Sequence, residues 1–143
     1  MRLTRITVYT PAAVLNYVAE AYGAMLDAEP ATGEDERGVC ITVTDTAGFT
    51  IELRPVEPGV GAPTVTRLEF HGADAADAAE RLHDVTGGVQ RHLFGGRWDS
   101  IAGNSVRLIG DGDEPDPEER ERIRAAIQRG ELEQELERMN AEP

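Results

Sequence analysis

The chain has 143 residues, a formal net charge of −13 and a single cysteine, Cys40. A chain this acidic repels phosphate backbones, which argues against nucleic-acid binding, and it lacks the apolar run of ~20 residues that a membrane helix needs. Because one cysteine excludes an internal disulfide, we expect a protein of the reducing cytoplasm. Acids gather toward the end, since residues 111–143 hold 12 acids and 5 arginines. The composition therefore predicts one packed domain followed by an acidic tail.

The first third of the chain predicts strands arranged around one helix. Three segments alternate polar and apolar side chains, as half-buried strands do: residues 2–9, 39–44 and 49–54. The polar segment at residues 29–37 is expected to contribute a short edge strand. Thr10 and Pro11 are typical of a helix start, with Thr10 as the N-cap, and apolar residues then recur at helical spacing as far as Asp27. Residues 45–48 form a short turn with glycine, which predicts a β-hairpin.

The same order of elements returns about 55 residues later, after a linker rich in proline and glycine at residues 55–63. Predicted strands again surround one helix: residues 65–71, 89–94, 97–99 and 105–109. Asp74 is placed to cap the helix and Gly87 to end it, while residues 100–104 turn the chain before the last strand. The repeat predicts two modules of one strand–helix–three-strand pattern.

The acidic tail carries its own helix signals. Asp116 and Pro117 predict the start of a helix that runs to Arg129, and a second helical piece follows Gly130. Its apolar stripe is thin: Ile123, Ile127, Leu132, Leu136 and Met139. A stripe this thin needs a surface to pack on. Three outcomes stay open, namely docking on its own sheet edge, disorder, or the version we favour, a homodimer in which the tail reaches across to the second subunit.

Both modules end in similar motifs, a turn followed by the last strand: Asp45-Thr46-Ala47-Gly48-Phe49-Thr50-Ile51-Glu52-Leu53 and Ser100-Ile101-Ala102-Gly103-Asn104-Ser105-Val106-Arg107-Leu108. The paired motifs resemble the D-P-D-G-N-x-x-E-L ending of the vicinal oxygen chelate superfamily, which includes glyoxalase I, extradiol dioxygenases and bleomycin- and fosfomycin-resistance proteins. This resemblance implies an α+β fold of two tandem βαβββ modules that form a curved mixed sheet around a cleft. The glyoxalase-like domain would span residues 1–110, with modules at about 1–56 and 63–110, followed by the acidic helical tail at 111–143.

The resemblance also implies where metal ligands would lie, on the first and last strands of the modules. The matching positions here are Arg5, Glu52, Arg67 and Arg107. Only Glu52 is able to coordinate a metal, because a guanidinium stays protonated and repels a divalent cation. The three histidines show none of the spacings typical of metal motifs. We therefore expect no metal and no other cofactor.

Alternation places a polar face opposite the helices, and seven of its residues are our ligand-binding candidates: Arg5, Tyr9, Glu52, Arg67, Glu69, His71 and Arg107. Two interpretations stay open. The charges either pair with each other as structural ion pairs, or the arginines bind an anionic or polar small molecule as bidentate donors. No catalytic residue is assigned, and a thiolate nucleophile at Cys40 assisted by His71 is the less favoured possibility, since a lone cysteine in a strand usually packs. Trp98 is a further candidate for stacking on a planar ligand.

Three functions follow as hypotheses. The favoured one is a non-metal small-molecule-binding protein of the glyoxalase/bleomycin-resistance type, with a polar or anionic ligand in an arginine-lined cleft. The alternatives are a metal-independent enzyme of lyase or isomerase type, and an interaction module that uses the acidic C-terminal helix. The expected partners are a small molecule and a second copy of the chain, without nucleic acid or membrane.

Overall fold

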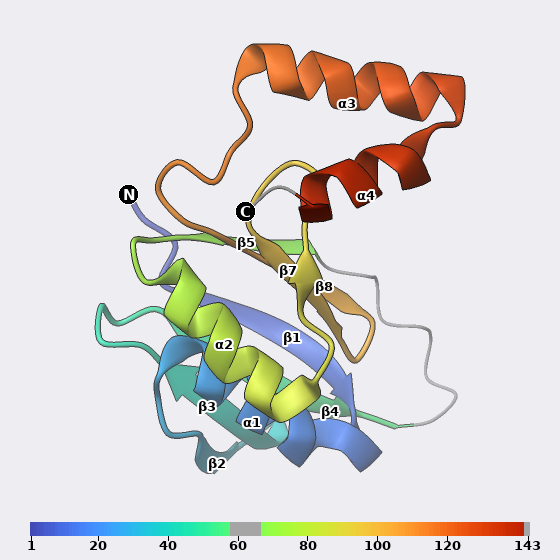
Figure 1. Cartoon of the computed structure of the whole chain (residues 1–143). Coiled ribbons are helices and arrows are strands. Elements are labelled where there is room, and N and C mark those ends of the chain that lie inside the picture. Colours follow the sequence, from blue (N-terminus) through green and yellow to red (C-terminus); the bar gives the residue numbers. More distant parts are fainter. Residues whose placement is uncertain (58–66, 142–143) are drawn as a thin grey trace.

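The computed structural model describes residues 1–57 and 67–141, and it contains both predicted modules and the helical tail (Figure 1). The first module consists of β1 (Arg5–Pro11), a 3-10 turn (Ala12–Val14), α1 (Leu15–Leu26), β2 (Ala31–Asp35), β3 (Gly38–Thr44) and β4 (Thr50–Val56). The second consists of β5 (Arg67–His71), α2 (Ala75–Thr86), β6 (Gln90–Arg91), β7 (Arg97–Ile101) and β8 (Asn104–Ile109). The tail contributes α3 (Pro117–Arg129) and α4 (Leu132–Ala141).

Each module forms its own four-stranded mixed sheet, with strand orders β1-β4-β3-β2 and β5-β8-β7-β6. In both sheets the first and last strands of the module pair in parallel, and the remaining pairs are antiparallel. The predicted α+β class and the tandem βαβββ order are confirmed. The strands are divided between two sheets, and the two modules share one core.

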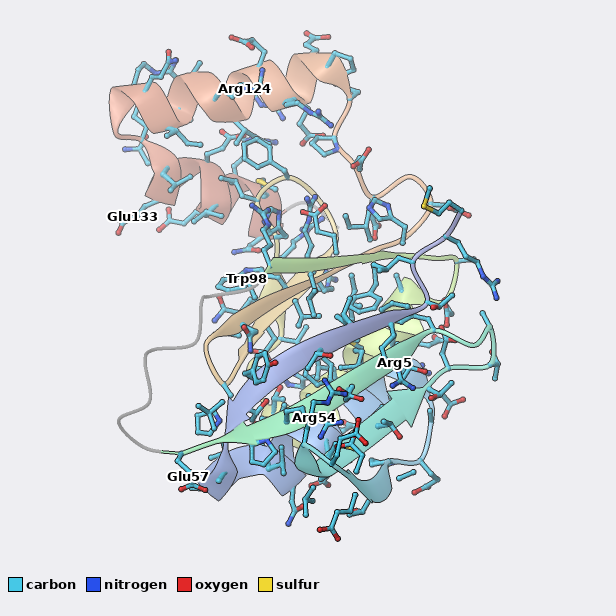
Figure 2. The ribbon with its side chains drawn as sticks, turned by 180° about the vertical axis from the view of Figure 1, so that it is seen from behind. Arg5, Arg54, Glu57, Trp98, Arg124 and Glu133 are labelled. Carbon is cyan, nitrogen blue, oxygen red and sulfur yellow. The ribbon has the colours of Figure 1, made fainter. Side chains whose placement is uncertain are left out.

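The core lies between the sheets and the helices α1 and α2, which cover the same side of the molecule (Figure 1). Tyr22 of α1 and Leu82 of α2 are fully buried, together with apolar residues of the strands such as Ile51 and Val106. Arg81 adds a polar link between the modules, because its Nε donates to Ala24 O at 2.8 Å. The opposite side of the sheets, seen in Figure 2, is therefore free to carry polar side chains.

The start of the first helix differs from the prediction. Thr10 is not its N-cap, because β1 continues through Pro11 in register with β4 and buries Thr10, whose hydroxyl donates to Val8 O at 3.5 Å. The helix α1 begins at Leu15, after the 3-10 turn. Asp74 does precede α2 directly, yet its side chain does not cap the helix. Gly87 ends α2 with a φ of 66°, as predicted.

The predicted strand at residues 89–94 is reduced to the two residues of β6. A tight turn follows it, in which Gly95 and Gly96 have φ values of 96° and 77°, conformations that side chains disfavour. The His92 amide donates to Gly96 O at 2.9 Å and closes the turn. Most of the predicted linker at 55–63 lies outside the described residues, as do the first two residues of the strand predicted at 65–71.

The tail helix α3 has the predicted bounds, since the Asp116 carboxylate accepts the Glu119 amide at 2.8 Å and Gly130 ends the helix with a φ of 73°. Its docking differs from the version favoured above. Arg91 of β6 donates through Nη1 to Met139 O of α4 at 2.6 Å, so the tail docks on module 2 of its own chain. The homodimer itself stays a prediction. No helix of the described segments is long and apolar enough to cross a membrane.

Candidate functional site

The polar face of the sheets is built by strand register, because residues directly opposite each other on paired strands point the same way. In module 1, Thr7, Glu52 and Thr42 are register partners across β1, β4 and β3. In module 2, Glu69, Arg107 and Trp98 hold the corresponding places across β5, β8 and β7. The central polar positions of the two sheets are thus Glu52 and Arg107.

Glu52 is the centre of an ion network in module 1, which we call the Glu52 cluster: Arg5, Thr7, Asp35, Arg37, Glu52 and Arg54. Figure 2 shows the positions of Arg5 and Arg54. Only 2% of Glu52 is exposed. Its Oε2 accepts from Arg5 Nη1 at 3.1 Å, and its Oε1 accepts from Thr7 Oγ1 at 3.2 Å and Arg54 Nε at 3.0 Å. The Arg54 hydrogen bond is the main reason that the pKa of Glu52 lies below its ordinary value.

Arg54 connects the Glu52 cluster to the β2–β3 turn. Its Nη1 and Nη2 donate to the two carboxylate oxygens of Asp35 at 2.9 and 2.6 Å, and Nη1 also donates to Gly38 O at 3.3 Å. The bidentate Arg54 pair, with the Arg37 amide, lowers the pKa of Asp35 from 3.8 to about 2. Arg37 lies 3.5 Å from Glu52 Oε1. Sequence reasoning missed Asp35 and Arg37, because the polar segment at residues 29–37 indicated only an edge strand.

Arg107 is the centre of the corresponding group in module 2, the Arg107 cluster: Arg67, Glu69, Arg107 and the carbonyls of Phe94 and Gly95. Arg107 is 7% exposed. It donates to Gly95 O at 3.0 Å, to Phe94 O at 2.6 Å and to Glu69 Oε1 at 3.3 Å. Arg67 approaches the same Glu69 oxygen at 3.3 Å. Arg107 therefore fixes the turn after β6.

Of the three arginines at the implied metal positions, Arg5 is the one that pairs with Glu52 in the described part of the chain. Arg67 and Arg107 pair with Glu69, because each module gathers its own charges. Among the described residues of this face, the ion pairs each join two residues of one module. The interpretation of the buried members as structural ion pairs is thus supported for Glu52, Arg54 and Arg107.

The reachable members of the face include Arg37 of the β2–β3 turn, whose side chain is 58% exposed, and the first-strand residues. The side chains of Arg5 and Arg67 are 56% and 60% exposed, Tyr9 is 55% exposed, and His71 is also exposed. Arg5 and Arg67 are each tied to a single carboxylate, which leaves most of the guanidinium facing solvent. A ligand that reaches Arg5 or Arg67 would meet an exposed cation already paired with one carboxylate.

Two other side chains differ from expectation. His92, which sequence reasoning left out, lies beside the Arg107 cluster, and its Nδ1 accepts from the Phe94 amide at 3.1 Å. Burial first, and then the charges of Arg107 and Arg67, lower the pKa of His92 below its ordinary value. Cys40 is buried in β3 of module 1, whereas His71 is exposed on β5 of module 2. These placements do not assemble a thiolate–imidazole pair.

The residues at the implied metal positions do not fit a divalent metal. Three of them are arginines, and both oxygens of the fourth, Glu52, already accept hydrogen bonds from positively charged donors. Within residues 1–57 and 67–141, no group of three or more His, Cys, Asp or Glu side chains is placed to hold a metal ion. The arrangement instead suits anions and neutral polar groups, which guanidinium donors bind.

Solved structures share this fold at low sequence identity. The antibiotic-binding protein TnmS3 from Streptomyces sp. CB03234 is 17% identical, with a TM-score of 0.56 over 77% of this chain and 95% of that one. A glyoxylase/bleomycin resistance protein/dioxygenase domain from Frankia sp. EAN1pec is also 17% identical, with a TM-score of 0.57 over 77% and 98%. The fosfomycin resistance protein FosX from Listeria monocytogenes is 13% identical, with a TM-score of 0.50 over 76% and 90%.

No protein-family model matches the chain, and no curated protein matches it significantly. Identities of this size establish the fold alone. The chain thus has the fold of the glyoxalase, bleomycin-resistance and dioxygenase proteins, as the paired motifs at the module ends predicted.

Proposed function

We propose that the polar face binds a polar or anionic small molecule without a metal, with Arg5 and Arg67 as its direct contacts. The observation that carries this proposal is the shared exposure of these two guanidiniums, 56% and 60%, on the first strands of the two modules. Arg37 of the Glu52 cluster, with a side chain 58% exposed, adds a further reachable cation in this chain of net charge −13. Guanidiniums bind carboxylates and phosphates with paired hydrogen bonds, which favours an anionic ligand.

The remaining candidate residues assist the two arginine contacts in this proposal. The exposed arginines or the nearby backbone are oriented by Glu52, Glu69 and Arg107. Two further side chains, Tyr9 and His71, are exposed on the same strands as the two contacts. The antibiotic-binding role of TnmS3, which shares the fold, also supports binding rather than metal-dependent catalysis.

The test uses calorimetric titration of the full chain with phthalate, benzoate and benzamide, three planar probes with two, one and no carboxylates. We expect affinity to fall in that order, and Arg5→Gln and Arg67→Gln each to weaken phthalate binding by about tenfold, the loss of one charged contact. Arg124→Gln, on an exposed position of α3, is the matched control and leaves binding unchanged. Equal binding of benzamide and phthalate, or full phthalate affinity in the double variant, would contradict the proposal.

Compartment and assembly belong to the same proposal. We place the protein in the reducing cytoplasm, because its one cysteine is a free, buried thiol. We also expect a homodimer, the commonest symmetric assembly, which light scattering of the full chain tests. A lyase or isomerase of this fold would need a proton-transferring group on the same face, and His71 is the exposed residue to replace in such an assay.

A further inference from the structure

A cavity of about 370 Å³ lies between the tail and module 2, and neither of the two arginine contacts proposed above is among its lining residues. Six residues line it: Gln90, Arg91, His92, Leu136, Met139 and Asn140. Three come from β6 and the residue after it, and three come from α4. Its volume lies within the range typical of small-molecule sites. The resemblance to the repeat ends near residue 110, so the tail adds a wall that the two modules alone do not provide.

The tail helix that forms this wall is held by specific contacts. Arg91 Nη1 donates to Met139 O at 2.6 Å, which ties α4 to β6 across the cavity. Within α4, Glu135 accepts from Arg122 of α3 at 3.2 Å and from Arg138 at 2.6 Å. These pairs keep the Glu135 carboxylate at the α3–α4 contact. The face of α4 that meets β6 therefore presents Leu136 and Met139.

Charge at the cavity is opposite in sign to the rest of the tail. None of the six lining residues is acidic, although α4 itself contains three glutamates and the tail holds 12 acids. Arg91 contributes a full positive charge to the wall. His92 borders the Arg107 cluster, and both Arg67 and Arg107 act electrostatically on its ring. One wall of the cavity is thus cationic and polar, and the α4 wall is apolar at Leu136 and Met139 and polar at Asn140.

We infer that this cavity binds a small amphipathic anion, with its aromatic or aliphatic body on Leu136 and Met139 and its carboxylate or sulfonate on Arg91. The body gains by leaving water against apolar side chains, and the anionic group gains a charge-assisted hydrogen bond. Burial lowers the pKa of His92, so its neutral ring adds a hydrogen-bonding edge without a second full charge. This site does not rest on the function proposed for Arg5 and Arg67, since the two sets of residues do not overlap.

The probe for the test is 1-anilinonaphthalene-8-sulfonate, an aromatic anion whose fluorescence rises in apolar surroundings. Its uncharged analogue N-phenyl-1-naphthylamine has a similar body without the sulfonate, and sodium sulfate supplies the charged group alone. With the full chain we expect saturable binding of one sulfonate probe per chain. The uncharged analogue should bind about tenfold more weakly, and sulfate should compete only at far higher concentration.

Four variants locate the binding. Arg91→Gln should weaken the sulfonate probe by about tenfold, Arg91→Lys should keep affinity within about threefold, and Asn140→Trp should abolish binding by filling the cavity from α4. Ile127→Ser, on an exposed apolar position of α3, is the control for unspecific apolar adsorption and should change nothing. Circular dichroism reports whether the tail stays helical in each variant.

Several results would overturn the inference. Equal affinity for the charged and uncharged probes would show an apolar surface without anion recognition. Undiminished binding in Asn140→Trp, with helicity intact, would place the probe elsewhere. Loss of helicity in Arg91→Gln makes Asn140→Trp the deciding variant, because that change leaves the Arg91 contact to Met139 O in place. If phthalate binding at Arg5 and Arg67 fails while these results hold, the proposed function falls and this site stands.

Discussion

The two modules hold equivalent turns with different acceptors. In each, an arginine of the last strand reaches the turn that connects the second and third strands of the module. Arg54 of β4 binds the Asp35 carboxylate and Gly38 O at the β2–β3 turn. Arg107 of β8 binds the carbonyls of Phe94 and Gly95 at the β6–β7 turn. One contact is mainly ionic, and the other is mainly to the backbone.

The charges of the two central positions are also inverted. Glu52 of β4 pairs in register with Thr7, whereas Arg107 of β8 pairs in register with Glu69. A buried acid surrounded by arginines makes module 1 depend on ionisation, while a buried arginine facing carbonyls makes module 2 depend on backbone shape. The repeat therefore preserves the position of a polar centre and not its chemistry. A buried acid or arginine at this position is therefore better explained by a structural role near the turn than by binding of a ligand.

The largest expected effect concerns backbone shape in module 2. Gly95 has a φ of 96°, and a Cβ built there overlaps the Asp113 carbonyl at the start of the tail. We expect Gly95→Ala to lower the free energy of unfolding by about 3 kcal/mol or more, since strain and overlap add. Urea denaturation measures it. Gly103→Ala, at a φ of 86° with open space around it, is the control and should cost only about 1 kcal/mol. Equal losses would show that the turn moves freely.

The next effect concerns ionisation in module 1. Glu52→Gln keeps the side chain's shape but removes the negative charge that faces Arg5 and Arg54. Leaving these guanidiniums without a buried counter-charge should lower the free energy of unfolding by about 2–3 kcal/mol. Denaturant midpoints at pH 7 test this, with Glu133→Gln on the exposed tail as the control. A midpoint equal to that of the unaltered chain would show that module 1 does not depend on its buried acid.

Acid should weaken module 1 selectively. The pKa of Asp35 is lowered from 3.8 to about 2 in the folded chain. A carboxyl with a depressed folded pKa stabilises the fold above its unfolded pKa, and this contribution is lost as pH falls toward the folded value. The Asp35 contribution is therefore present above about pH 4 and disappears between pH 4 and 2. The lowered pKa of Glu52 acts in the same direction.

The measurement compares Asp35→Asn with the unaltered chain at pH 7, 4 and 2.5. The variant should be less stable at pH 7, and the difference should shrink toward zero at pH 2.5. Asp84→Asn, at an exposed position of α2, serves as the control with no pH-dependent difference. The amide protons of the β6–β7 turn should keep their exchange protection at pH 2.5, because Arg107 binds mainly carbonyls there. Equal loss of protection in both turns would remove the distinction between the modules.

Short-range signals predicted much of this molecule. The bounds of α3 follow from Asp116, Pro117 and Gly130, which act within a few residues of the helix ends. Alternation likewise placed Glu52 and Arg107 on the polar face. The partners of these groups could not be predicted, since Arg54 meets an acid 19 residues away and Arg107 meets carbonyls exposed by a glycine turn. The tail's docking on Arg91 depends on a surface that exists only after module 2 has folded.

The smallest expected effect extends the comparison to the helices. Tyr22 of α1 and Leu82 of α2 hold corresponding buried positions, with exposures of 0% and 1%. Among the described residues, the Tyr22 hydroxyl has no hydrogen-bond partner, and burial raises its pKa to about 12.

Tyr22→Phe removes this unsatisfied group and keeps the ring, which makes module 1 as apolar here as module 2. We expect the free energy of unfolding to stay equal or rise by up to about 1 kcal/mol, because a lone buried hydroxyl costs desolvation without return. Thermal and urea denaturation measure the change, and Tyr17→Phe on the exposed side of α1 is the control. A free energy of unfolding that falls by more than about 1 kcal/mol would mean that the Tyr22 hydroxyl makes a hydrogen bond in solution. The helices of the two modules would then not differ in this respect.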